Sequence, residues 1–226
     1  MPGASRTLPA PAVRVTGGSK LGAMNAAGAP EWVVREDASA PTVVALYLRQ
    51  ALGVRSPDEL PHLRGIDATP PDRSADEQHE LERQWRAYFA MTVEPLAHPS
   101  PVPLDLVAGF DTLVALPTEG FDLLEREMRP HAARAVAFAR DVQARYAARS
   151  DSAGAVAYRA YAGALAQHER RIGRRAHSFE LNVQVLPLSQ RGVWWIGSLT
   201  IAVTDGLRSD IAAFDAAIAP IIAEIA

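Results

Sequence analysis

The most basic stretch of the sequence, QHERRIGRRAHS over residues 167–178, has the composition of an anion-binding segment. Guanidinium groups form paired hydrogen bonds with carboxylates and phosphates. The candidates for this role are Arg171, Arg174 and Arg175. Alternatively, these cations lie in the last turns of a helix and stabilise the negative end of its dipole. We favour this alternative because acidic residues open the other predicted helices in the same manner.

His131 and Glu169 are the candidates for acid–base chemistry, since they are the polar members of two apolar stripes. An imidazole and a carboxylate in contact could move a proton to or from a substrate. If a turn is centred at Asp151, His131 and Glu169 lie 20 and 18 residues from it, and therefore at nearly the same level. Such a pair more often fixes the register of two helices than catalyses a reaction, and we favour the structural interpretation.

Common motifs of metal and cofactor sites are absent from the sequence. The chain has no cysteine, which excludes disulfides, thiol chemistry and zinc sites built from cysteine. Its six histidines are scattered, without HExxH spacing, and no P-loop or dinucleotide-binding fingerprint is present. The sequence therefore predicts no metal and no cofactor, and it does not decide whether the chain is an enzyme.

The segment RGVWWIGSLTIAV, residues 191–203, places two tryptophans side by side in a predicted strand. Neighbouring strand side chains point to opposite faces, so we expect Trp195 to face the core and Trp194 to face away. Trp194 would share its face with three other apolar side chains. This predicted contact surface consists of Leu186, Leu188, Trp194 and Ile196. Burying such side chains is worth about 1.5–3 kcal/mol each, so we expect a protein partner or a second copy of the chain to cover them.

Composition limits the classes of function. At 226 residues, 48% of them hydrophobic, the chain can bury a core of its own. A net charge of -3 provides no general attraction to nucleic acid or anionic lipid. No signal peptide and no uninterrupted run of 18 apolar residues is found. These features predict a cytoplasmic protein that binds neither nucleic acid nor a membrane.

The clearest helical periodicity lies between residues 119 and 176. Apolar positions recur three and four residues apart on both sides of Ser150, Asp151 and Ser152. We therefore predict two long amphipathic helices joined by a short turn at these three residues, an antiparallel αα-hairpin.

Other elements are predicted from local signals. A capping box of Ser74 and Glu77 predicts a helix from there to about residue 94. The apolar segment 104–116 is compatible with a strand or a helix, and we favour a helix. Residues 31–35 form a short strand candidate.

The C-terminal part, residues 178–226, is predicted to be a β-hairpin followed by a helix. A three-residue loop, Gln190 to Gly192, pairs Val183 with Leu199 and gathers apolar side chains on one face.

The predicted fold class is α+β. A helical bundle over residues 41–176, dominated by the long αα-hairpin, packs on a small antiparallel β-sheet and a C-terminal helix. Residues 1–30, rich in Gly, Ala and Pro, are predicted to be an arm that is flexible or bound to a partner. Residues 31–226 are predicted to form a single domain.

Two functions agree with these features. The first is a non-enzymatic interaction or structural subunit that self-associates or docks a protein partner through the predicted contact surface. The second is an enzyme or small-ligand binder with a site of arginine, histidine and glutamate between the helical hairpin and the sheet. We favour the first because the sequence contains no catalytic motif.

Overall fold

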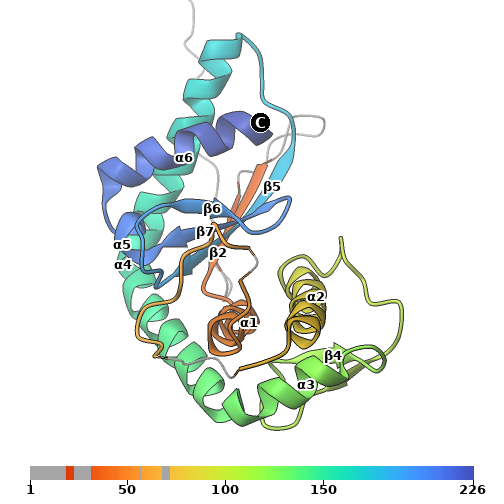
Figure 1. Ribbon diagram of the computed structural model, residues 1–226. Coiled ribbons are helices and arrows are strands. Elements are labelled where there is room, and N and C mark those ends of the chain that lie inside the picture. Colours follow the sequence, from red (N-terminus) through yellow and green to blue (C-terminus); the bar gives the residue numbers. More distant parts are fainter. Residues whose placement is uncertain (1–18, 23–31, 56, 68–71) are drawn as a thin grey trace, which may run out of the picture.

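A mixed β-sheet with helices packed against it organises the chain (Figure 1). The computed structural model describes residues 19–22, 32–55, 57–67 and 72–226, and for residues 19–22 and 150–157 it describes the backbone only. The predicted arm over residues 1–30 thus lies outside the described residues except for one short strand.

The sheet has five strands in the order β1-β2-β5-β7-β6. Its three central strands, β2, β5 and β7, are parallel, and the edge strands β1 and β6 run antiparallel to their neighbours. The strands are β1 (Ser19–Gly22), β2 (Trp32–Asp37), β5 (Phe179–Leu186), β6 (Val193–Trp195) and β7 (Thr200–Thr204). A separate two-stranded antiparallel hairpin consists of β3 (Leu104–Leu106) and β4 (Ala115–Pro117).

Helices account for most of the remaining described chain. They are α1 (Ala40–Ala51), α2 (Ala75–Val93), α3 (Asp122–Met128), the 3₁₀ turn η1 (Arg129–His131), α4 (Ala132–Ile172), α5 (Asp205–Arg208) and α6 (Ile211–Ile225). The capping box predicted for α2 is confirmed, because Ser74 accepts from the Glu77 backbone N–H and Glu77 accepts from that of Ser74. None of these helices is long and apolar enough to cross a membrane.

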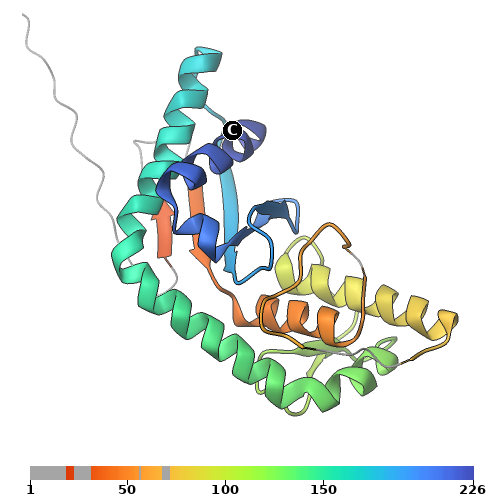
Figure 2. The same ribbon diagram turned by 60° about the vertical axis from the view of Figure 1, so that its left-hand side comes forward.

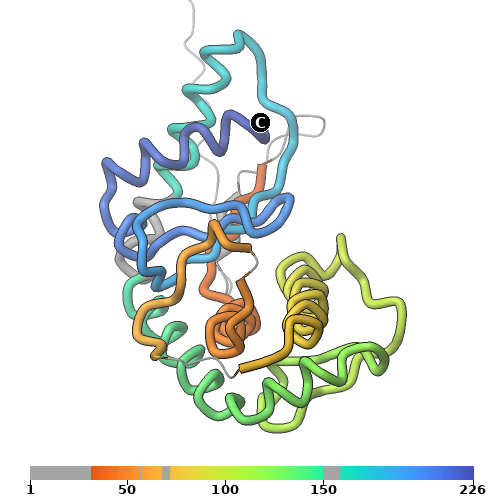
Figure 3. Tube along the Cα trace, viewed as in Figure 1, coloured from red at the N-terminus to blue at the C-terminus, as the bar shows by residue number. Residues whose placement is uncertain are grey.

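Two hydrophobic clusters hold the elements together, and α4 contributes to both. The first cluster joins α1, α2 and the N-terminal half of α4 around Trp85 and Phe110. The second joins the C-terminal half of α4 to α6 and one face of the sheet, around Tyr161 and Phe214. The Cα trace shows these groups of elements at the two ends of α4 (Figure 3).

The predicted αα-hairpin and helical bundle are wrong, since residues 132–172 form one helix, α4, of 41 residues (Figure 2). Ser and Asp lower helix propensity by only about 0.5–0.7 kcal/mol each relative to Ala, which is too little to break an alanine-rich helix at residues 150–152. The helix ends at Gly173, whose φ of 71° is the left-handed conformation of a helix C-terminus. The two apolar stripes arise because one helix packs against α1 near one end and against α6 near the other.

The predicted antiparallel sheet and its register are also wrong. Val183 pairs with Ile201 in parallel β5 and β7, not with Leu199 in an antiparallel hairpin. The hairpin instead joins β6 to β7, and β7 lies between β5 and β6. All five residues of β7 are buried, which is typical of a central strand covered on both faces.

The favoured helix over residues 104–116 is replaced by the β3–β4 hairpin. Its connection contains two residues with positive φ, Gly109 at 88° and Asp111 at 54°. Such residues suit a tight turn and interrupt a helix. The predicted strand at residues 31–35 and the C-terminal helix correspond to β2 and α6.

Glu94, which follows α2, connects that helix to the turn between β6 and β7. Its carboxylate accepts hydrogen bonds from the backbone N–H groups of Ser198 and Leu199, at 3.0 and 2.7 Å. The hydroxyls of Ser198 and Thr200 donate to it at 2.8 and 3.1 Å. Gly197 permits this approach, because a Cβ there would lie 2.5 Å from the carboxylate carbon.

Candidate functional site

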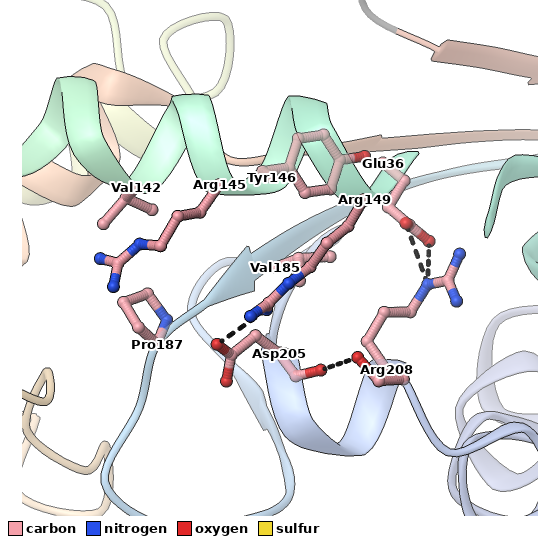
Figure 4. A pocket seen from close by; sticks show the side chains of 10 residues that line it. Glu36, Val142, Arg145, Tyr146, Arg149, Val185, Pro187, Asp205 and Arg208 are labelled. Atoms are coloured by element: carbon pink, nitrogen blue, oxygen red, sulfur yellow. Dashed lines mark hydrogen bonds and ion pairs between the residues drawn. The ribbon is translucent and has the colours of Figure 1, made fainter. Parts of the chain in front are cut away.

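A pocket lies between the middle of α4 and the carboxyl ends of the parallel strands β2 and β5, with α5, which follows β7, at its side (Figure 4). It has about 520 Å³ of empty space, counting the part open to solvent. Ligands of α/β proteins commonly bind at this edge, where loops and helix ends from several strands meet. The lining residues are Glu36, Val142, Arg145, Tyr146, Arg149, Val185, Pro187, Asp205, Arg208 and Ser209.

One face of α4 provides four of the lining residues. Positions three and four apart on a helix lie on the same side, and this spacing relates Val142, Arg145, Tyr146 and Arg149. The two arginines lie one turn apart, and their side chains extend from α4 across the pocket in Figure 4. The helix therefore presents two cations to the same opening.

The floor of the pocket is a buried ion pair. Nε of Arg208 lies 2.9 Å from both carboxylate oxygens of Glu36, and the two side chains are only 8% and 7% exposed. The Tyr161 hydroxyl donates a further hydrogen bond to Glu36 at 3.0 Å. The guanidinium of Arg208 also lies 5.0 Å from the ring centre of Phe214, a favourable cation–π arrangement. Removing either charge would leave the other buried without compensation.

Tyr146 lines the pocket above this pair. Burial raises the pKa of its hydroxyl, and the negative charges of Glu36 and Asp37 raise it further. The phenol therefore stays protonated at neutral pH, and its hydrogen bond to the Glu36 carboxylate favours the same state.

The mouth of the pocket contains ion pairs of a different kind. Arg149 lies 3.3 Å from Asp205, and Nη2 of Arg64 lies 2.6 Å from both oxygens of the same carboxylate. Arg145 pairs with Asp141 at 2.8 Å. The three arginine side chains are 50–59% exposed. Exposed pairs contribute only about 0–1 kcal/mol each, which applies to Arg145 and Asp141, whereas the Asp205 carboxylate is only 17% exposed.

The pocket thus combines apolar walls with two arginine side chains that are at least half exposed. Val142, Val185 and Pro187 form the apolar part, against which a small hydrocarbon group could pack. Among the described residues, no group of three or more His, Cys, Asp or Glu side chains could hold a metal ion. The arrangement is suited to a small organic anion.

The predicted anion-binding arginines lie at the far end of α4 from this pocket, at and beyond the helix terminus. Arg171 contacts Nδ1 of His168 at 3.2 Å, and Arg174 contacts Nε2 of His177 at 3.2 Å. Arg175 lies 3.5 Å from Glu169. They surround the end of the helix, and their binding of an anion stays a prediction.

The predicted contact between His131 and Glu169 does not exist, because both residues belong to one continuous helical path. They are separated by roughly 57 Å along the axis, at about 1.5 Å per residue. Glu169 accepts from the Ala176 N–H at 3.0 Å and so helps to end α4. His131 is half-buried, and burial together with the charges of Arg134 and Arg73 lowers its pKa.

The predicted contact surface lies largely against the chain's own core. Leu186 and Leu188 are 0% and 1% exposed and belong to the cluster of α1 and α2. Trp194 and Ile196 are half-buried and pack against that cluster. The expected orientation of the tryptophans is reversed, since Trp195 is the exposed one, at 36%.

Comparison with protein-family models, curated proteins and solved structures finds no match to this chain. The site therefore has to be interpreted from its geometry alone.

The sequence interpretation missed the residues that form the pocket. The only local signal was the spacing of Arg145 and Arg149 on one helical face, because Glu36 is one of three charged residues that end β2. This signal does not identify the site without the position of Arg208, which is 172 residues from Glu36.

Proposed function

We propose that this protein binds a small organic anion in the pocket between α4 and the sheet. The observation that carries the proposal is that Arg145 and Arg149 reach from one face of α4 over an apolar wall at the carboxyl edge of the parallel strands. The anionic group would pair with the arginines and the hydrocarbon body would pack on Val142 and Val185.

The energies of the ion pairs at the pocket mouth favour the replacement of an aspartate by a ligand anion as the partner of the arginines. Arg145 is paired with Asp141 in an exposed ion pair, which stabilises the fold by about 1 kcal/mol or less, and the exposed guanidinium of Arg149 is paired with the more enclosed Asp205. A ligand anion in contact with both guanidinium groups would form charge-assisted hydrogen bonds with each. Arg208 does not take part in this exchange, because its pairing with Glu36 is buried.

A series of three compounds of one shape tests the proposal: benzoate, phenyl phosphate and neutral benzamide. Isothermal titration calorimetry is expected to detect binding of one or both anions and much weaker binding of benzamide. The double substitution Arg145→Gln and Arg149→Gln should weaken anion binding at least tenfold. Arg159→Gln is the matched control, since Arg159 is an exposed arginine of the same helix that does not line the pocket.

The proposal is contradicted if neither benzoate nor phenyl phosphate binds, and two further results would also contradict it. One is equal affinity for benzoate and benzamide, which would show that charge is not recognised. The other is an equal loss of affinity in the double variant and in the Arg159 control.

Docking of a protein partner through Leu186, Leu188, Trp194 and Ile196 is the less favoured function. Two of these side chains are buried, so the surface left for a partner consists of parts of Trp194 and Ile196.

A further inference from the structure

We infer that Asp205 occupies the anion-binding position of this pocket in the free chain, and that the anionic group of a ligand, while it contacts Arg145 and Arg149, displaces this carboxylate and gains Arg64 as a third partner. This inference rests on the proposed function and specifies how the same site is regulated.

The geometry around Asp205 is that of a bound carboxylate. Two arginines from distant segments converge on it, Arg64 at 2.6 Å and Arg149 at 3.3 Å. The Asp205 side chain is 17% exposed, whereas those of both arginines are more than half exposed. The carboxylate is thus enclosed between its cations at the pocket mouth, where Figure 4 shows Arg149 directed toward it.

Both arginines are positioned by contacts that do not involve Asp205. The backbone N–H of Arg64 donates to the Pro187 carbonyl at 2.8 Å. The neighbouring Leu63 forms a β-bridge with Leu188. Arg149 is held by the backbone of α4. The backbone of both arginines is therefore placed independently of Asp205, and both side chains can still reach the same space when its charge is removed.

A tethered carboxylate competes strongly with a free one. Groups linked by a short connection act at effective concentrations in the millimolar range or above. An anion that offers only its charge is then displaced by Asp205. An anion whose apolar body also contacts Val142 and Val185 gains additional binding energy and can displace Asp205. The ligand class is therefore a carboxylate or phosphate on a compact apolar body.

The substitution Asp205→Asn tests this inference directly. Asparagine keeps an oxygen for the Gly206 N–H, which donates to the Asp205 carboxylate at 2.8 Å, but removes the competing charge. Benzoate, measured by calorimetry, should bind at least tenfold more tightly to this variant than to the unmodified chain. Asp111→Asn is the matched control, because Asp111 forms an exposed ion pair with Arg140 outside the pocket, and its affinity for benzoate should not change.

A second variant, Arg64→Gln, tests the same inference without changing Asp205. Arg64→Gln should weaken benzoate binding several-fold although Arg64 does not line the pocket in the free chain, because the ligand replaces its present partner. Acetate should bind Asp205→Asn measurably more tightly than the unmodified chain. A thermal melt of each variant, expected within about 4 °C of the unmodified chain, verifies that it is folded.

The outcomes separate this inference from the proposed function. If benzoate binds the unmodified chain and Asp205→Asn does not bind it more tightly, Asp205 is not the competitor and the proposed function remains. Unchanged affinity in Arg64→Gln would likewise overturn the inference alone. If neither benzoate nor phenyl phosphate binds the unmodified chain or Asp205→Asn, both are overturned.

Discussion

The floor and the mouth of the pocket are built from the same kinds of charged group and have opposite properties. At the floor, Glu36 and Arg208 are almost completely buried and joined by two hydrogen bonds of 2.9 Å. At the mouth, Asp205 pairs with two arginines that are more than half exposed. Solvent screening makes the second set weak and exchangeable, whereas burial makes the first set obligatory. A carboxylate–guanidinium contact is therefore part of the fold at Glu36 and Arg208, and part of the proposed binding site at Asp205.

The largest effect is expected when the floor is broken. Arg208→Met leaves the Glu36 carboxylate buried without its cation, and breaking such a pair costs about 3–5 kcal/mol. Urea unfolding followed by circular dichroism should show this loss. The double variant Glu36→Gln with Arg208→Met should recover much of it, because no buried charge remains. A loss below about 1 kcal/mol in Arg208→Met would remove the distinction between floor and mouth.

An intermediate effect is expected at Glu94, which is partly buried and accepts four hydrogen bonds from the β6–β7 turn. Glu94→Gln should cost about 2 kcal/mol at pH 7, since hydrogen bonds to a charged group contribute about 1.5–3 kcal/mol each and glutamine retains part of them. Burial raises the pKa of Glu94, but the hydrogen bonds from Leu199 and Ser198 outweigh it and hold the pKa below the ordinary 4.5.

The pH dependence of this loss has a definite sign. Because the pKa is lowered in the folded chain, the charged carboxylate stabilises the fold above pH 4.5 and loses this contribution as the pH falls through the lowered value. Urea unfolding should therefore show a smaller difference in the free energy of unfolding between the unmodified chain and Glu94→Gln near pH 3 than at pH 7. Glu119→Gln, at an exposed loop position, is the control. If the difference in the free energy of unfolding between the unmodified chain and Glu94→Gln grows on acidification, the charged Glu94 carboxylate does not stabilise the fold.

The smallest effect on stability is expected at the mouth. Arg149→Gln removes an exposed ion pair and should change the free energy of unfolding by less than about 1 kcal/mol, while it weakens anion binding. Urea unfolding measures the change in stability, with Arg159→Gln as the control. Calorimetry with benzoate measures the change in affinity. A large loss of stability without a loss of affinity would place Arg149 among the structural residues, with Arg208.

Local elements could be predicted from the sequence where the signal is contained in a few neighbouring residues. The capping box of Ser74 and Glu77 fixes the start of α2, whereas the helical periodicity was followed to residue 176 and α4 ends at Ile172, before Gly173. The alternation in β5 is real, but alternation does not tell which strand lies beside it. A strand pairs in parallel or antiparallel according to the path of the chain between the two, and that path depends on contacts such as the Leu63–Leu188 bridge.

The tryptophan pair shows why faces were assigned wrongly. Trp195 shares a face with Ile201, which is completely buried, as the sequence pattern suggests. β6 is an edge strand, however, so the cover that buries Ile201 does not extend equally to Trp195. Trp194 instead lies over Gly192, where a Cβ would approach its ring to 2.8 Å. Burial at a sheet edge is decided by neighbouring elements and not by the period of the strand.

The pocket could not be found from the sequence because its parts are brought together by the tertiary structure alone. Arg208 and Glu36 are 172 residues apart, and each has other charged residues beside it in its own segment, so neither can be singled out locally. The predicted turn at residues 150–152 also divided the helix that carries Arg145 and Arg149, and so directed attention to its ends.

The length of α4 has a mechanical consequence. A helix of 41 residues is about 60 Å long, and hydrogen bonds along its axis make it resist extension and compression. The two hydrophobic clusters pack against different parts of this helix, and Tyr146 contacts both of them. The pocket lies where the two clusters meet along α4, so a molecule bound there contacts a helix that belongs to both of them.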